Sequence, residues 1–134
     1  MKKNLLVHKH LIIRAESKRP IKDEKKAVEW MKELIASLNM KVFIGPYAKY
    51  CGMEGNKGLT VMAVIETSHI VMHVWDEVNP ALIQLDIYSC GHFDEHDVCK
   101  KISKDFELSK IEYKYLNRET GLTDISQGTM NYNG

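Results

Sequence analysis

Residues 66–77, ETSHIVMHVWDE, combine the pattern of a buried strand with an unusual density of reactive groups. Apolar residues dominate as in a core β-strand, yet the segment also holds a serine, two histidines, a tryptophan and three carboxylates. Charged and polar side chains are seldom buried unless they are paired. The segment is therefore predicted to be a β-strand that holds reactive side chains of a functional site.

The segments around this stretch are predicted to form strands and two helices. Residues 5–16 alternate as in a strand that has a polar face. Asp23 is a suitable N-cap for a helix that ends near Asn39, and Asp94 could cap a shorter helix that includes Phe106. Further strands are expected at 40–45, 59–66, 69–77, 81–90 and 110–119, with a loop over 46–58.

This order of elements predicts an α+β fold, a two-layer sandwich with a mainly antiparallel β-sheet and two helices on one face. Residues 1–119 are predicted to form a single domain because no repeat or linker divides them. The small polar segment 120–134 is predicted to be an irregular C-terminal tail. Since helices on one side leave the other face of the sheet uncovered, we expect a homodimer.

Composition points to a small-molecule substrate. The 19 Lys and Arg residues are nearly balanced by 18 Asp and Glu residues, so no basic field favours nucleic acid or an anionic membrane. The first apolar run is interrupted at His8 and Lys9, which predicts neither a secretory signal nor a membrane span. Cys51, Cys90 and Cys99 lack disulfide or zinc spacing, which favours reduced thiols in the cytoplasm.

Ser68 and His73 suggest a self-cleavage reaction. A serine in a strained bend can attack the carbonyl of its own preceding peptide if a base accepts its proton. The product is an ester, and elimination from it would leave two chains. The second chain would begin with a pyruvoyl group made from Ser68, a ketone that can condense with an amino acid.

These residues resemble the bacterial and archaeal S-adenosylmethionine decarboxylases, the short, self-processing and pyruvoyl-dependent type. The resemblance rests on Ser68-His69, His73, Trp75, Glu77 and the string DIYSCG at 86–91, and it extends over about residues 5–118. It implies the same fold, a covalent pyruvoyl cofactor, and decarboxylation of S-adenosylmethionine to the aminopropyl donor for spermidine, a polyamine.

The resemblance also implies roles in cleavage and turnover. Cleavage would fall between Thr67 and Ser68, with His73 promoting it and the Thr60 hydroxyl helping to hold the oxyanion. Cys90 would donate a proton to the product carbanion.

The substrate-binding residues implied by the resemblance are an acid and two aromatic side chains. Glu77 would bind the ribose hydroxyls. Tyr50 or Tyr47 would offer an aromatic face to the adenine or the sulfonium.

Two departures from the family pattern stand out. Thr67 occupies the position before the serine, where the family usually has glutamate, and Glu66 lies one residue earlier. The connection before the cysteine strand, EVNPALIQ at 77–84, is two residues longer. The first departure bears on processing and the second on the rim of the pocket.

Three alternatives stay open on the sequence. One is a pyruvoyl-dependent arginine or ornithine decarboxylase on the same fold. Another is a nucleoside-binding protein of this fold that never cleaves itself. The third is a metal site formed by strand histidines, although no tight ligand spacing supports it and no metal is expected. The histidines concerned are His8, His10, His69 and His73.

Overall fold

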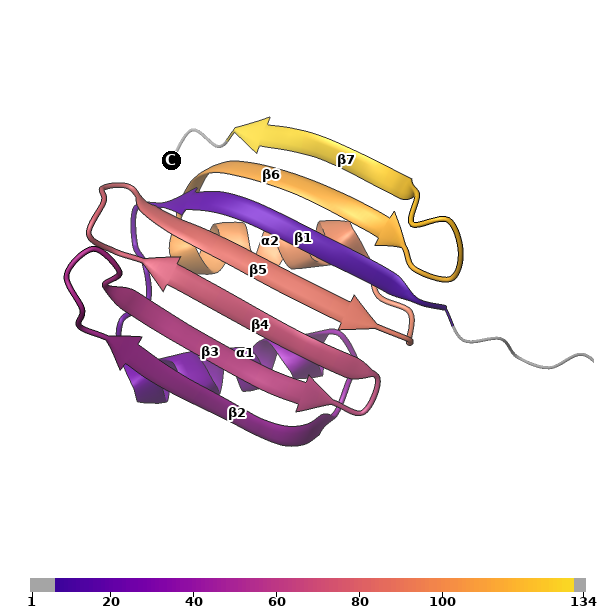
Figure 1. The fold of residues 1–134 in the computed structure, drawn as a ribbon, viewed down its shortest axis with the longest axis horizontal. Coiled ribbons are helices and arrows are strands. Elements are labelled where there is room, and N and C mark those ends of the chain that lie inside the picture. Colours follow the sequence, from indigo (N-terminus) through magenta and orange to yellow (C-terminus); the bar gives the residue numbers. More distant parts are fainter. Residues whose placement is uncertain (1–6, 132–134) are drawn as a thin grey trace, which may run out of the picture.

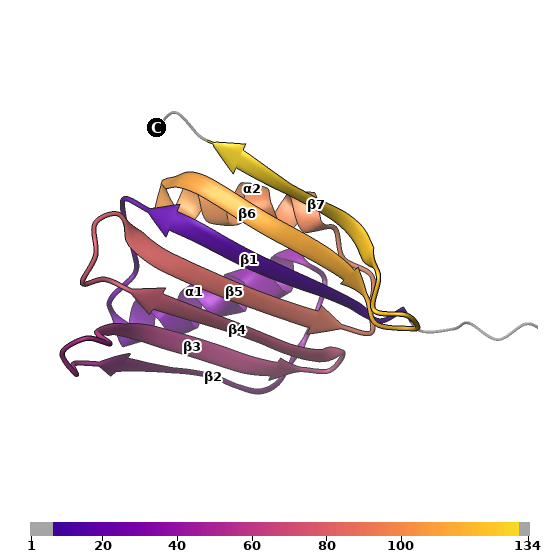
Figure 2. The ribbon, with the colours of Figure 1, turned by 45° about the horizontal axis from the view of Figure 1, so that its top comes forward.

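The computed structural model describes residues 7–131 and shows a seven-stranded antiparallel sheet with two helices on one face (Figures 1 and 2). The strands are β1 (Lys9–Ser17), β2 (Val42–Cys51), β3 (Gly58–Ile65), β4 (Ser68–Trp75), β5 (Ala81–Ser89), β6 (Leu108–Asn117) and β7 (Asp124–Asn131), and the helices are α1 (Glu24–Ser37) and α2 (Glu95–Phe106). The strand order is β2-β3-β4-β5-β1-β6-β7. The predicted α+β architecture is confirmed.

Both helices begin at the aspartates that the sequence indicated. The Asp23 side chain accepts a hydrogen bond from the Lys26 N–H at 2.9 Å, and Asp94 accepts one from the His96 N–H at 2.7 Å. Each bond satisfies a backbone donor that the first helical turn leaves without a partner. Neither of the described helices has the length and apolar character needed to span a membrane.

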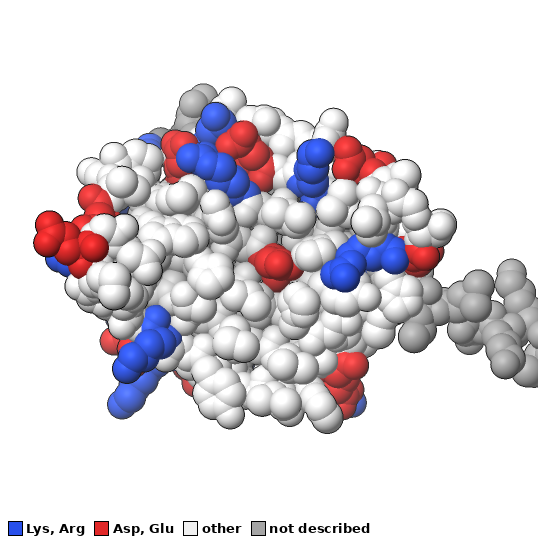
Figure 3. All heavy atoms as spheres, in the orientation of Figure 1, with Lys and Arg blue, Asp and Glu red and all other residues white. Residues whose placement is uncertain are grey.

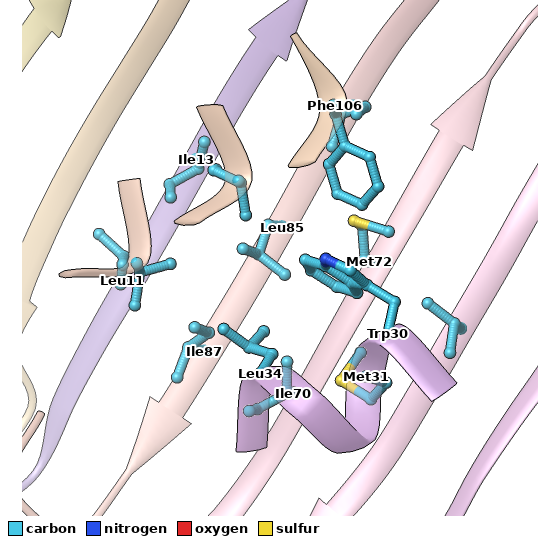
Figure 4. Packing of buried hydrophobic residues seen from close by; sticks show 14 of the residues in the cluster. Leu11, Ile13, Trp30, Met31, Leu34, Ile70, Met72, Leu85, Ile87 and Phe106 are labelled. Carbon is cyan, nitrogen blue, oxygen red and sulfur yellow. The ribbon is translucent and has the colours of Figure 1, made fainter. Parts of the chain in front are cut away.

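The core lies between the helices and one face of the sheet (Figure 4). Alternate residues of the central strands point into it, because successive side chains of a strand face opposite sides. Burying each large apolar side chain contributes about 1.5–3 kcal/mol. The buried set includes Leu11, Ile13, Ile70, Met72, Leu85 and Ile87 from the sheet and Trp30, Met31, Leu34 and Phe106 from the helices.

The opposite side of the sheet, which we call the open face, has no helix over it (Figure 1). Charged side chains are sparse across its middle and more frequent at its margins (Figure 3). Ile12 of β1 and Met62 of β3 alternate away from the core and are 45% and 43% exposed. An uncovered surface of this kind is typical of an interaction site.

Two segments that were predicted to be irregular contain strands in the structure. The loop expected over 46–58 is shorter, because β2 continues to Cys51 and pairs with β3. The register shifts between Ile44 and Tyr47, and this bulge accommodates Pro46, which has no N–H to donate.

The second correction concerns the C-terminal segment. Residues 120–134 were predicted to be irregular, but Asp124–Asn131 forms β7 and pairs with β6. The pairing satisfies the outer edge of β6, and Gly128 lets the chain pass close to the Tyr113 ring. The expected start of the first strand at Leu5 lies outside the described residues.

Candidate active site

Ser68 follows a tight turn and has an unusual backbone conformation. Glu66 and Thr67 connect β3 to β4, and Ser68 pairs with Ile65 across the hairpin. Its φ angle is 140°, a region that side-chain-bearing residues rarely occupy. Such a conformation stores about 1–3 kcal/mol of strain and persists only where the surroundings hold it. The strained bend expected at this serine is present.

The turn is held by the residues that follow β5. The carbonyl oxygen of Thr67 accepts a hydrogen bond from the Cys90 backbone N–H at 2.7 Å. Ser89 Oγ donates to Thr67 Oγ1 at 2.9 Å and accepts from the Gly91 N–H at 2.9 Å. The structure therefore brings Thr67, Ser68 and Cys90 together.

Thr60 and His73 form a second group, on the open face. Thr60 Oγ1 lies 2.8 Å from His73 Nδ1 across β3 and β4, and the His73 ring rests 5.7 Å from that of Trp75. His73 is five residues beyond Ser68 on an extended strand, a separation of about 16 Å. Within one chain these two residues do not reach Ser68.

Glu77 lies just beyond β4, at the end remote from Ser68. Its carboxylate accepts hydrogen bonds from the backbone N–H groups of Lys57 (3.0 Å) and Gly55 (3.2 Å). These bonds stabilise the charged form and lower the pKa of Glu77. The carboxylate thus anchors the loop between β2 and β3.

The two predicted tyrosines lie in different surroundings. The Tyr50 hydroxyl donates to both carboxylate oxygens of Asp76, at 2.9 and 3.0 Å, and this bond raises the pKa of Tyr50. Tyr47 is 64% exposed and pairs with Met62. Asp76 was missed in the sequence reasoning, although it stands in the WDE string beside Glu77.

A polar cluster occupies the open face between β4, β5 and β1. His10 hydrogen-bonds Asp86, and His69 Nε2 lies 3.8 Å from the same carboxylate. Partial burial opposes ionisation of Asp86, but the hydrogen bond from His10, supported by the positive charge of Arg118, holds the pKa of Asp86 below the usual value. Arg118 also stacks on the Tyr88 ring, 3.8 Å from its centroid.

This cluster brings together two of the four histidines that were considered for a metal site. The ligand atoms of His10, His69 and Asp86 lie within 4.8 Å of one another, whereas His8 contacts Tyr88 and His73 bonds Thr60. Arg118 Nη1 donates to His10 Nδ1 at 3.3 Å, since a guanidinium has no acceptor. His10 Nε2 then carries the proton and faces Asp86, so the cluster is arranged as a hydrogen-bonded network.

A hollow of about 890 Å³ lies on the helix side of the molecule. It is lined by α1, the end of α2 and the segment before α1, with Trp30 and Phe106 among its residues. None of the predicted site residues borders it. Within one chain, the predicted catalytic residues therefore form two separate groups at the two ends of β4, whereas Tyr47 pairs with Met62 opposite the middle of that strand.

Comparison with known proteins gives a consistent result. A family model described as S-adenosylmethionine decarboxylase matches residues 9–119. An S-adenosylmethionine decarboxylase proenzyme from Pyrobaculum arsenaticum is 35% identical over 102 residues, covering 75% of this chain and 77% of that protein. The corresponding proenzyme from Pyrobaculum neutrophilum is 37% identical over 94 residues, covering 69% and 67%.

A relative with a different name also matches. A protein from Ignicoccus hospitalis named arginine decarboxylase proenzyme is 35% identical over 69 residues, covering 52% of this chain and 45% of that protein. The family match spans most of the chain and includes every residue of both groups described above. The chain belongs to the S-adenosylmethionine decarboxylase family and is a decarboxylase, a carboxy-lyase.

Proposed function

We propose that this protein is a cytoplasmic S-adenosylmethionine decarboxylase that forms its own pyruvoyl cofactor by cleavage between Thr67 and Ser68. Its product would be the aminopropyl donor for spermidine synthesis. One observation carries the proposal. The carbonyl oxygen of Thr67 accepts the Cys90 N–H at 2.7 Å, directly before a serine with φ 140°. A strained serine and a polarised carbonyl both favour the attack that begins self-cleavage.

Cleavage starts with attack of Ser68 Oγ on the carbonyl carbon of Thr67. The C–O bond forms, the C–N bond breaks, and the proton of the hydroxyl is transferred to the released amine. The Cys90 N–H stabilises the negative charge that develops on the carbonyl oxygen. Relief of the backbone strain at Ser68 favours the same step.

Elimination then completes the cleavage. A base removes the α-proton of Ser68, and the Thr67 carboxylate leaves from its β-carbon. Water hydrolyses the resulting enamine, releases ammonia and leaves the pyruvoyl group at the start of the second chain. When present, this group supplies a ketone that withdraws electrons from the substrate bond that breaks.

A homodimer explains how His73 and Thr60 take part. In one chain they lie about 16 Å along β4 from Ser68. If two open faces pack about a two-fold axis near the middle of β4, the partner's His73 lies over the β3–β4 turn that precedes Ser68, and the contact is reciprocal. Exposed Ile12 and Met62 and the sparse charge in the middle of the open face support such packing (Figure 3).

The substrate would contact both groups. Cys90 adjoins Ser68 and would donate the proton to the substrate carbon after loss of carbon dioxide. Glu77 would hold the ribose, since a carboxylate has about four acceptor positions and two are used by Lys57 and Gly55. Tyr50 and Tyr47 would offer their rings to the adenine or sulfonium.

Arginine is the second candidate substrate, favoured by the name of the Ignicoccus hospitalis relative.

Intact-mass spectrometry and carbon dioxide release test the proposal together. Freshly purified protein should convert to two fragments divided at Thr67–Ser68, and Ser68→Ala should remain whole. The cleaved protein should release labelled carbon dioxide from carboxyl-labelled S-adenosylmethionine in preference to arginine and ornithine. A full-length species that persists through prolonged incubation contradicts self-cleavage. Release from arginine or ornithine alone contradicts the substrate and leaves the cleavage standing.

A further inference from the structure

Ser89 is a completely buried polar residue at the end of β5. Among residues 7–131, Ser17 and Ser89 are the polar residues buried to this degree, each with 0% exposure. Ser89 pairs with Ser68 in the β4–β5 register. A buried hydroxyl needs hydrogen-bond partners, and the partners of Ser89 lie in the turn that contains the proposed cleavage site.

The direction of these hydrogen bonds is fixed by their donors. The Gly91 N–H can only donate, so Ser89 Oγ accepts it at 2.9 Å. The Ser89 proton is then directed to Thr67 Oγ1, also at 2.9 Å. Gly91 supports the arrangement by its size, because a β-carbon there would lie 3.3 Å from Thr67 Cγ2. The Thr67 side chain is therefore held from one side by residues 89–91.

The same segment, residues 89–91, also holds the Thr67 carbonyl. Its oxygen accepts the Cys90 N–H at 2.7 Å, so Thr67 is anchored both at its side chain and at its backbone. Threonine is β-branched and has few χ1 rotamers, so an anchored hydroxyl restricts the orientation of its backbone as well. The peptide between Thr67 and Ser68 is therefore held at its carbonyl oxygen and, through the Thr67 side chain, at the Thr67 Cα.

We propose that Ser89 is a positioning residue for self-cleavage, which orients the Thr67 carbonyl toward Ser68 by holding the Thr67 hydroxyl. The inference rests on the proposed self-cleavage. Ser89 itself does not touch the reacting carbonyl carbon and acts through Thr67. Correct alignment of a nucleophile and its carbonyl accounts for much of the rate of an intramolecular attack. Loss of one neutral hydrogen bond should slow cleavage about 2- to 10-fold.

Four variants test this proposal, with the cleavage rate of the full chain followed by intact mass. Ser89→Ala should cleave more slowly and Ser89→Thr, which keeps the hydroxyl, should restore the rate. Thr67→Val should slow cleavage to a similar extent because it removes the acceptor. In the double variant Ser89→Ala with Thr67→Val, loss of Ser89 should have no further effect, as expected for two residues that share one interaction.

Ser17→Ala is the matched control. Ser17 is also fully buried, donates to the Phe106 carbonyl at 2.6 Å and accepts the Arg19 N–H at 3.1 Å, but it lies away from Thr67 on β1. Its loss should lower the melting temperature about as much as Ser89→Ala and leave the cleavage rate unchanged. Equal slowing by both serine variants would show a general effect of stability and overturn the proposal.

Hydroxylamine separates the two steps of cleavage. It attacks the ester carbonyl of Thr67, forms a hydroxamate there and frees the Ser68 hydroxyl. If Ser89 positions the carbonyl for ester formation, hydroxylamine should not restore the cleavage rate of Ser89→Ala. If hydroxylamine does restore that rate, Ser89 acts in the elimination step and the inference is overturned. If Ser89→Ala cleaves at the unmodified rate, this inference fails and the self-cleavage proposal stands. If the unmodified protein does not cleave, the self-cleavage proposal and this inference both fail.

Discussion

Thr60 and His73 face each other across β3 and β4, with Thr60 Oγ1 2.8 Å from His73 Nδ1. The pair lies on the open face, about 16 Å along β4 from Ser68. The hydrogen bond fixes the orientation of the imidazole, which leaves Nε2 as the atom available to another group. That other group, in the proposed dimer, is on the partner subunit.

Complementation between two inactive variants should reveal such a shared site. Ser68→Ala and His73→Ala should each fail to cleave or cleave very slowly when produced alone. In a mixed dimer, the His73→Ala chain retains Ser68 and faces an intact imidazole on its partner. Co-expression should therefore restore cleavage of the His73→Ala chain only, as measured by intact mass with distinguishable tags.

The same mixture also has a clear contrary outcome. If His73 acted on Ser68 of its own chain, the mixture would cleave no faster than the separate variants. Ser68→Ala mixed with unmodified protein serves as the control for exchange of subunits. Sedimentation at micromolar concentration should show a species of twice 15.4 kDa.

Cys90→Ala should separate cleavage from turnover. Alanine keeps the backbone N–H that bonds the Thr67 carbonyl, so cleavage should proceed at a rate close to that of the unmodified protein. Loss of the thiol removes the proposed proton donor, so turnover should fall and inactivation during turnover should rise. Cys99→Ala is the control, because that thiol is buried and burial raises its pKa to about 11. Normal turnover in Cys90→Ala would exclude the proton-donor role.

The elements were predictable where the local signal was strong. Asp23 and Asp94 indicated both helix starts, and alternation in residues 5–16 indicated the polar and buried faces of β1. β7 was missed because it forms by pairing with β6, and its two apolar residues, Ile125 and Met130, are five positions apart and so do not give the alternation that marks a strand. Pro46 suggested a loop because proline has no N–H for strand pairing. The bulge that accommodates it depends on the pairing with β3 and cannot be seen in the sequence.

The site was predictable as a set of residues but not as an arrangement. Motif spacing identified Ser68, His73 and Cys90, but strand geometry places His73 far from the other two within the chain. The cluster of His10, Asp86 and Arg118 comes from three strands or strand ends that are distant in sequence, so no local pattern could reveal it. Ser89 was only one letter of the DIYSCG string until its bond to Thr67 was seen.

Glu77 should make stability depend on pH. Its pKa is lowered from 4.5 in the folded protein by the N–H groups of Lys57 and Gly55, so its contribution is fully present above pH 4.5. The contribution is lost as pH falls below 4.5 and the carboxylate is protonated. Urea denaturation of Glu77→Gln should show a deficit at pH 7 that shrinks as the pH is lowered toward 3.5. Glu54→Gln, in the same exposed loop, is the control, and a deficit that is constant with pH would contradict this role.

Gly58 should tolerate no side chain, because β3 begins there in direct contact with the backbone of β4. A β-carbon at Gly58 would lie 1.7 Å from the Val74 carbonyl oxygen and 2.7 Å from its carbon, far inside van der Waals contact. Since both neighbours are backbone atoms of the sheet, Gly58→Ala must displace the start of β3 and with it Thr60, two residues later. We expect a loss of about 3 kcal/mol or more in the free energy of unfolding.

Gly52→Ala is the control, because a β-carbon there meets nothing within 4 Å, and it should change the free energy of unfolding by less than about 1 kcal/mol. Thermal unfolding followed by circular dichroism compares the two, and similar melting temperatures would show that β3 and β4 are not as close as this contact requires.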